Sequence, residues 1–290
     1  MSSALARAAL FVVPALLVAG CAAPPAGEAA LARALAANAA HQLHAPAVMD
    51  SLLAAERGLS TARRVGLWAR RFLADPDSEY RFGLAPGGYA AEGLLAGDHR
   101  PDCVSLLYRA TELARAADHR DALRLALATR FAGAAADSAV DAAGRVDYDR
   151  PEHLDYSLDM IRAGHWGQDV TATLSGARPD SAGSARYAPG SFQYIPAGVL
   201  DPRQLREGDV VWLVLNPAHA AARRLREEHG LVIGHIGLII EEKGRILLVH
   251  AASSGLEGVY EGGRVVSVPL DLYLERVDRF AGVVVTRFTD

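Results

Sequence analysis

Cysteine and lysine are scarce in this sequence. Cys21 and Cys103 are the only cysteines among 290 residues, and Lys243 is the only lysine. Two cysteines exclude a disulfide-rich scaffold, and arginine supplies almost all of the positive charge. A long basic run is also missing and the formal net charge is -4, so the sequence gives no support to nucleic acid as a partner.

A hydrophobic run long enough to cross a membrane is missing too, but a shorter one lies near the amino terminus. The apolar residues 8–18 follow Arg7, contain Pro14 and lead into Val18-Ala19-Gly20-Cys21. This pattern resembles a bacterial lipoprotein signal peptide with its lipobox, which implies cleavage before Cys21 and a lipid on that cysteine. Ala22 in the next position implies the outer membrane, with the protein facing the periplasm. An ordinary secretory leader or a membrane anchor is the alternative.

Composition divides the rest of the chain into a connecting segment and a folded part. Residues 22–45 are rich in alanine, proline and small polar residues, which predicts a tether or a loosely held helix. Hydrophobic residues make up 51% of the chain, enough for a substantial core. We therefore expect a signal peptide and lipobox over residues 1–21, a tether over 22–45 and a folded domain over 46–290.

Helical periodicity marks the first half of the expected domain. Ser60 is the predicted N-cap of an amphipathic helix. Four arginines lie largely off its apolar stripe and are expected to face solvent: Arg63, Arg64, Arg70 and Arg71. A second helix is expected over about 121–135. The polar segment over 136–190 is either a lid or a wall, and its aromatic residues suit sugar or peptide binding as well as packing.

After Ser191 the pattern changes to short β-branched or alternating runs bounded by turn residues. The expected strands cover residues 192–195, 209–215, 231–240, 245–250, 264–268 and 281–287. Short helices are expected over 218–229 and 269–276. Helices followed by strands predict an α+β fold, in which a predominantly antiparallel sheet packs against a helix.

Cys103 stands at the start of an apolar-periodic run, directly after Pro101 and Asp102. Asp102 is a good N-cap and the apolar residues recur at helical spacing, so Cys103 is expected in the first turn of a buried helix. The unpaired N–H groups and the positive dipole end of such a turn favour the thiolate, which is the nucleophilic form. On position alone, a thiol that merely packs is the alternative.

Two histidines stand on neighbouring expected strands. His235 lies in Gly234-His235-Ile236-Gly237, and His250 ends the next strand. A tight hairpin around Glu242-Lys243-Gly244 makes these strands antiparallel neighbours and brings His235 roughly opposite His250, on one face. With Cys103 they form a possible set of nucleophile, base and orienting residue. With Asp209 they could instead hold zinc, although no H-x-x-x-H or H-E-x-x-H helix is present.

The order of these features resembles the NlpC-type papain-like cysteine hydrolases of bacterial cell walls. The resemblance rests on Asp102-Cys103 at a helix start, Gly208-Asp209 before a strand, the glycine-flanked His235 and the later strand-end His250. Shorter elements are similar to the N-acetylmuramoyl-L-alanine amidase-like branch: Asp102-Cys103-Val104-Ser105, Asp169-Val170-Thr171, Tyr194-Ile195-Pro196 and His250-Ala251-Ala252-Ser253-Ser254. The similarity covers the chain from about residue 60 to its end.

The resemblance implies a papain-like NlpC-type fold and gives roles to five residues. Cys103 is the expected nucleophile, His235 the general base and His250 the polar residue that orients the base. Tyr89 and Asp102 are expected to border the site and to hold the peptide end of the substrate. Amide hydrolysis by such a set needs no metal and no other cofactor.

The function expected from the resemblance is hydrolysis of an amide bond in the stem peptide of peptidoglycan or of muropeptides, by a protein anchored to the membrane through its lipid. The bond between N-acetylmuramic acid and L-alanine is the first choice. The bond between D-glutamate and the diamino acid, the target of an endopeptidase, is the second. A catalytically silent lipoprotein that binds peptidoglycan is the alternative from another class.

Overall fold

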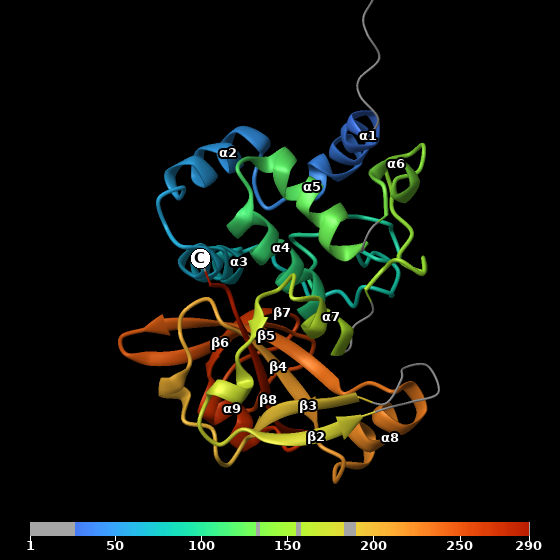
Figure 1. Ribbon diagram of the computed structural model, residues 1–290. Helices are drawn as coiled ribbons and strands as arrows, with labels where there is room; N and C mark the ends of the chain where they lie inside the picture. Colours follow the sequence, from blue (N-terminus) through green and yellow to red (C-terminus); the bar gives the residue numbers. More distant parts are fainter. Residues whose placement is uncertain (1–26, 132–133, 155–157, 183–189, 290) are drawn as a thin grey trace, which may run out of the picture.

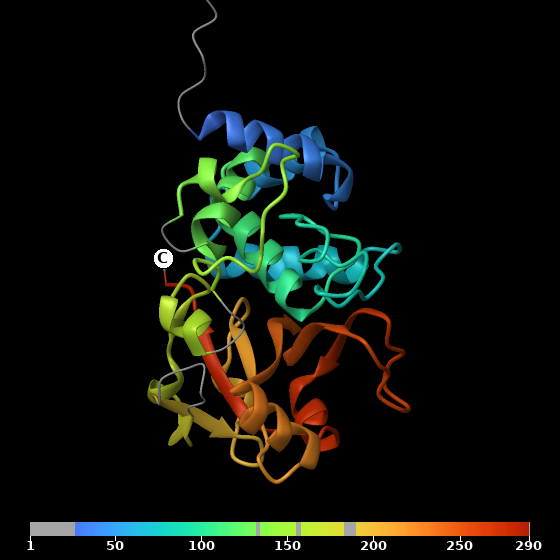
Figure 2. The ribbon, with the colours of Figure 1, turned by 90° about the vertical axis from the view of Figure 1, so that its right-hand side faces the viewer.

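The computed structural model describes residues 27–131, 134–154, 158–182 and 190–289, so Cys21 lies outside the described residues. Most helices lie in one half of the molecule and a twisted sheet fills the other (Figure 1, Figure 2). Within the described ranges, seven α-helices precede the first strand in the chain: α1 (Glu28–Asn38), α2 (Pro46–Ala55), α3 (Thr61–Ala74), α4 (Cys103–Arg115), α5 (His119–Arg130), α6 (Ala136–Ala139) and α7 (Leu158–Ala163). In the part of the chain that the structure describes, no helix is long and apolar enough to cross a membrane.

The sheet has the strand order β2-β3-β8-β4-β5-β6-β7, and β1 pairs with β8. Its strands are β1 (Gln168–Asp169), β2 (Arg178–Ala182), β3 (Gly190–Pro196), β4 (Val210–Leu215), β5 (Ile233–Glu242), β6 (Arg245–Ala252), β7 (Arg264–Pro269) and β8 (Phe280–Arg287). Helix α8 (Ala220–His229) follows β4, and α9 (Leu270–Arg276) follows β7. The pairings are antiparallel. The predicted α+β class with an antiparallel sheet is confirmed.

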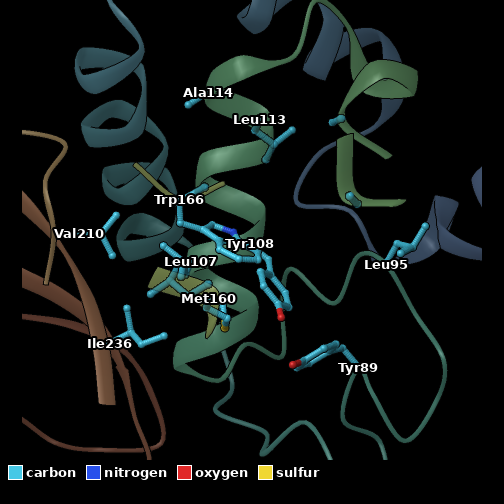
Figure 3. Close-up of a cluster of buried hydrophobic side chains, with 14 of the residues drawn as sticks. Tyr89, Leu95, Leu107, Tyr108, Leu113, Ala114, Met160, Trp166, Val210 and Ile236 are labelled. Atoms are coloured by element: carbon cyan, nitrogen blue, oxygen red, sulfur yellow. The ribbon is translucent and has the colours of Figure 1, made fainter. Parts of the chain in front are cut away.

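Alternation along the strands divides the sheet between two cores. Ile236 of β5 joins the core that contains the helices, whereas Ile239 joins the core on the other face, beside α9. Figure 3 shows Ile236 and Val210 of the sheet in one buried cluster with Leu107 and Tyr108 of α4. The helix that begins at Cys103 therefore packs against the sheet, as the sequence predicts.

Helix α1 packs more closely than a tether does. Ala30 and Ala34 are completely buried, and the side-chain oxygen of Asn38 accepts a hydrogen bond of 2.9 Å from the backbone N–H of Leu95. The small side chains of α1 let it lie directly on α5. Of the two alternatives expected for residues 22–45, a tether or a loosely held helix, the part from Glu28 to Asn38 is a helix, and it packs against the domain.

The arginines of α3 correct a second expectation in part, since Arg63 is exposed as expected but Arg64 is buried. Arg70 and Arg71 are partly buried in ion pairs. Arg64 is only 8% exposed, and its guanidinium donates to the carbonyl oxygen of Ala116 at 2.7 Å, just past the end of α4. Arg63 and Arg70 pair with Glu207. The final carbonyl groups of a helix have no partner within it, and Arg64 supplies the donor that the amphipathic pattern cannot reveal.

The helix expected over about 121–135 begins and ends earlier, at His119–Arg130. Asp118 is the N-cap, and Phe131 leaves the helical conformation to form a bridge with His153. In the polar segment that follows, Trp166 is completely buried with its ring 5.4 Å from that of Tyr108 (Figure 3). This aromatic residue therefore packs in the core.

Candidate active site

The start of α4 is built by local hydrogen bonds around Cys103, the first residue of the helix. One carboxylate oxygen of Asp102 accepts from the backbone N–H groups of Val104 at 3.0 Å and Ser105 at 2.8 Å. The Ser105 hydroxyl accepts from the Asp102 N–H at 3.0 Å, which completes a capping box. The second Asp102 oxygen accepts from Gly83 at 2.9 Å. Cys103 is partly buried on a helix start that is held from two sides.

The two predicted histidines meet, although not in the expected register. Nε2 of His235 lies 2.8 Å from Nδ1 of His250, with the rings perpendicular at 88°. The hairpin turns at Lys243 and Gly244, both with positive φ, so Glu242 pairs with Arg245 and Leu238 with Val249. His250 is thus diagonal to His235 rather than opposite it. A slip of two residues keeps both side chains on one face, which is why the pair still forms.

A β-bulge aims His235. His235 pairs with Leu213 of β4, whereas Ile233 pairs with the adjacent Val214, so Gly234 is an extra residue in β5. A side chain at Gly234 would begin 2.3 Å from the Leu215 side chain, and only glycine fits there. The bulge turns the imidazole toward α9 and the start of β8, where its ring stacks with that of Phe280 at 6.3 Å.

Aromatic rings enclose the histidine pair on the face that carries α9. The Tyr273 ring lies 5.0 Å from the His250 ring and 6.5 Å from the His235 ring, and Tyr260 lies 5.5 Å from His250. We refer to His235, His250, Tyr260, Tyr273 and Phe280 as the histidine corner.

The loop before α4 joins Cys103 to this corner. The Arg81 N–H donates to the Pro101 carbonyl at 3.3 Å, and the Tyr80 N–H donates to Gly263 at 2.6 Å. The Gly263 N–H in turn donates to the carbonyl of Ala252, the last residue of β6, at 2.7 Å. These bonds link the start of α4 to the end of β6, the strand that carries His250.

Electrostatics connect the same groups. Burial, together with negative charge on Cys103 and Asp102, raises the pKa of Tyr80 to about 12, and Arg279 opposes this rise. Burial also raises the pKa of Tyr273, where Tyr260 and Cys103 act in the same direction. The Cys103 sulfur therefore acts electrostatically on two tyrosines, of which Tyr273 touches both histidines.

Both histidines favour the neutral form. Burial and, to a smaller extent, the nearby Arg279 guanidinium lower the pKa of His235 to about 3. Burial lowers the pKa of His250 well below its usual range, with His235 adding to the effect. An ion pair between Cys103 and His235 must therefore draw its stability from the thiolate itself, since the other surroundings of His235 disfavour the imidazolium.

The hydrogen bond between the histidines limits what each nitrogen can do. It occupies Nε2 of His235, which leaves Nδ1 of that ring to take a proton. For this, His235 must donate from Nε2 to His250, and His250 must carry its own proton on Nε2. Among the described residues His250 Nε2 is buried without a hydrogen-bond partner, and the rings of Tyr260 and Tyr273 lie beside the imidazole as weak acceptors.

Asp102 and Tyr89 are both buried, at 4% and 7% exposure. Burial raises the pKa of Asp102, and the three backbone N–H groups that it accepts from oppose that rise. Tyr89 packs edge-on against Tyr148 at 5.1 Å (Figure 3 shows its hydroxyl directed toward α4). A cavity of about 710 Å³ borders Tyr89 together with Arg100 and Arg145, and Cys103 is not in its lining. Substrate contact by Asp102 and Tyr89 stays a prediction.

Asp209 does not join the histidines as the zinc alternative requires. Its two carboxylate oxygens each accept from the Arg287 guanidinium at 2.7 Å, and it is 1% exposed. The Asp209 carbonyl accepts from Ile239, four residues along β5 from His235. Among the described residues no group of three or more His, Cys, Asp or Glu side chains is arranged to hold a metal ion.

Five residues at the site were not identified from the sequence: Tyr80, Tyr260, Tyr273, Arg279 and Phe280. Tyr80 comes from a loop, Tyr273 from the short helix α9, and Arg279 from the turn before β8. No periodic pattern marks them, because only the folding of the sheet brings them beside His235. An aromatic or basic residue next to a strand end is the sole signal that the sequence offers.

Comparison with known proteins identifies the fold. The chain matches no family model and gives no significant match to a curated protein. An N-acetylmuramoyl-L-alanine amidase from Bacteroides uniformis is similar in structure, with a TM-score of 0.58 and 18% identity, over 79% of this chain and 99% of the other.

Two further solved structures are similar over most of their length. A Legionella pneumophila protein of the family model DUF1460 gives a TM-score of 0.60 at 15% identity, over 83% of this chain and 93% of its own. A Bacteroides fragilis protein described as a candidate xylanase gives a TM-score of 0.56 at 19% sequence identity. The match covers 77% of this chain and 100% of the other. The first of these names states an amidase, another a candidate xylanase and the third no activity, although all three structures are similar to this chain. What the chain shares with these proteins is therefore an amidase-like α+β fold.

Proposed function

We propose that the protein is a cysteine-dependent hydrolase that cleaves an amide bond of peptidoglycan or muropeptides, with the bond between N-acetylmuramic acid and L-alanine as the preferred target. The observation that carries the proposal is the 2.8 Å bond between His235 and His250 beside a capped helix that begins with Cys103. The amidase-like fold supports the substrate class. The NlpC-type papain-like assignment is part of the same proposal.

In the proposed reaction, the Cys103 thiol loses its proton to Nδ1 of His235 and the sulfur attacks the amide carbonyl carbon. The imidazolium keeps its Nε2 proton in the bond to His250, which holds the ring in position. The tetrahedral intermediate expels the amine, which takes the proton from His235, and a thioester remains on Cys103. Water then gives a proton to His235, attacks the thioester and releases the acid, and the thiol is restored.

The first step gains from the start of α4. Backbone N–H groups in the first turn of a helix have no partner within the helix, and the dipole favours negative charge there. Both effects stabilise the thiolate and the oxyanion that develops on the carbonyl oxygen. Burial leaves the His235 imidazole unprotonated before the reaction but disfavours the imidazolium that the proton transfer forms, so the helix start must supply the compensating stabilisation.

The proposal places the protein in the cell envelope. Residues 1–21 act as a lipoprotein signal peptide and lipobox, Cys21 carries the lipid, and the domain faces the periplasm from the outer membrane. What supports this is the sequence Val18-Ala19-Gly20-Cys21 after a short apolar run. Metabolic labelling with a fatty acid tests it, since Cys21→Ala should lose the label and the wild-type chain should keep it.

Mass spectrometry of the products from defined muropeptides tests the activity. Protein that lacks residues 1–21 is incubated with an N-acetylmuramoyl tripeptide. An amidase releases the sugar and a peptide with a free L-alanine amine, whereas an endopeptidase cleaves between D-glutamate and the diamino acid. Unchanged substrate, together with an ordinary slow-reacting Cys103 thiol, would leave a peptidoglycan-binding lipoprotein as the function.

A further inference from the structure

Arg279 occupies a fixed place beside the histidine corner. Its carbonyl accepts a hydrogen bond of 2.8 Å from the Asn216 backbone, and the Asn216 side chain donates to the neighbouring Asp278 carbonyl at 2.8 Å. These two bonds secure the turn between α9 and β8. The Arg279 guanidinium lies 5.0 Å from the Phe280 ring centre, and that ring stacks on His235 with an angle of 18° between the planes. An exposed cation thus stands one aromatic ring away from the proposed base.

No carboxylate among the described residues forms an ion pair with Arg279. The adjacent Asp278 is turned toward α8, where one of its oxygens lies 3.8 Å from Nε2 of His219. Of the two acidic residues on α9, Asp271 accepts from the Leu272 backbone N–H at the other end of the helix, and Glu275 is exposed. By contrast, the buried arginines Arg109 and Arg130 each bind a carboxylate. Arg279 keeps its donors available on the surface.

The position of this unpaired cation opposes the proposed chemistry of the free enzyme. The Arg279 charge lowers the pKa of His235 and also acts on Tyr80 and Tyr273. A cation beside a general base disfavours the imidazolium that forms when Cys103 gives up its proton. A bound anion next to Arg279 removes that disadvantage, because it neutralises the guanidinium at the moment the base must become charged.

We propose that Arg279 binds a free carboxylate of the substrate next to the scissile bond, and so selects peptides that carry an acidic residue there. The inference rests on the proposed function. In a stem peptide cleaved at L-alanine, that group is the α-carboxylate of the following D-glutamyl residue. A guanidinium offers two parallel N–H donors to such a carboxylate, which gives orientation as well as charge. The substrate then supplies the anion that the free enzyme lacks.

Two N-acetylmuramoyl tripeptides that differ only at the D-glutamyl α-carboxylate, free in one and amidated in the other, test the proposal. The readout is the ratio of kcat/KM for the free acid to kcat/KM for the amide, in wild type, Arg279→Gln, Arg279→Lys and Arg276→Gln. Arg276 is an exposed arginine at the end of α9 and serves as the matched control. We expect wild type to prefer the free acid and Arg279→Gln to lose about 10- to 100-fold of that ratio, the size of a hydrogen bond to a charged group.

Arg279→Lys should keep part of the preference, and Arg276→Gln should keep all of it. Equal loss on both substrates in Arg279→Gln, or a wild type that treats them alike, would overturn the proposal. If wild type cleaves neither substrate, the proposed function fails. Calorimetry of the same two tripeptides with wild type and with Arg279→Gln then tests separately whether Arg279 binds the carboxylate. A binding preference that disappears in the variant supports the role, and equal binding contradicts it.

Discussion

Two groups of polar side chains, one on α4 and one on the face of the sheet that carries α9, differ in how completely they are paired. In the arginine network, formed by Asp98, Arg109, Glu112 and Arg130, every side chain is at most 1% exposed, and Arg109 binds Asp98 and Arg130 binds Glu112, each at 2.7 Å. In the histidine corner the two imidazoles bind each other. There, among the described residues, His250 Nε2 has no hydrogen-bond partner and the adjacent Arg279 has no carboxylate.

The difference separates a scaffold from a site. A buried charge that lacks a partner is costly, so the complete pairing of the arginine network indicates that it holds α4 against the loop that carries Asp98. The buried His250 Nε2, which has no partner among the described residues, marks the histidine corner as a candidate site, and the exposed Arg279 is open to an anion. Removal of one member of the arginine network should therefore reduce the free energy of unfolding. Removal of one member of the histidine corner should mainly reduce the activity.

The largest expected effect is on the nucleophile. Cys103→Ser should lower turnover of muropeptides by at least about 10³-fold, because the hydroxyl is much harder to ionise than the thiol. The free energy of unfolding should stay within about 0.5 kcal/mol, since serine is well suited to the first turn of a helix. Steady-state kinetics and urea unfolding measure the two quantities. Full activity in the variant would move the chemistry elsewhere.

The next effect tests the arginine network. Glu112→Gln leaves Arg109 and Arg130 with one anion too few in a buried site and should reduce the free energy of unfolding by about 3 to 5 kcal/mol. Urea or guanidinium unfolding provides the measurement. Glu227→Gln, on the exposed surface of α8, is the matched control and should change stability by less than about 0.5 kcal/mol. Similar losses in the two variants would mean that the network contributes little.

The two histidines should differ in activity. His235→Ala removes the base, whereas His250→Ala removes a group that only orients it, so the first should reduce kcat more than the second, by about 10-fold or more. Kinetics of both variants at one pH give the ranking. The reverse ranking would show that the two roles are exchanged.

The smallest expected effect, taken over a single pH unit, is on the pH dependence of stability. Burial lowers the pKa of His235 to about 3 and that of His250 well below 6.5, so below pH 6.5 the unfolded chain binds protons that the folded protein refuses. The free energy of unfolding should fall as the pH drops below 6.5, with a slope of up to about 1.4 kcal/mol per pH unit for each histidine that stays neutral in the folded protein. His250→Gln should remove one such contribution in a series of urea titrations. An unchanged slope would mean that His250 is readily protonated in the folded state.

The sequence predicts the Cys103 side of the site better than the histidine side. The helix start depends on Asp102 and Ser105, which act on backbone groups within three residues, so a local pattern is sufficient. The face shared by His235 and His250 also follows from alternation along the strands. Their register does not, because it depends on which two residues form the turn and on the extra residue at Gly234.

Tyr80, Tyr273 and Arg279 illustrate what local patterns cannot supply. They come from three separate segments of the chain. They lie near the histidine corner because β8, the last strand of the chain, lies between β3 and β4 in the sheet. The same holds for Arg64, whose partner at the end of α4 turns an apparently surface arginine into a buried one. Contacts between distant segments decide these positions.

The rate at which iodoacetamide alkylates Cys103 tests the central claim most directly, because Cys103 is the only cysteine in protein that lacks residues 1–21. The account predicts rapid alkylation near neutral pH in wild type and a much slower rate in His235→Ala, with the fold unchanged. Equal rates in the two proteins, both following the pH dependence of an ordinary thiol, would contradict it.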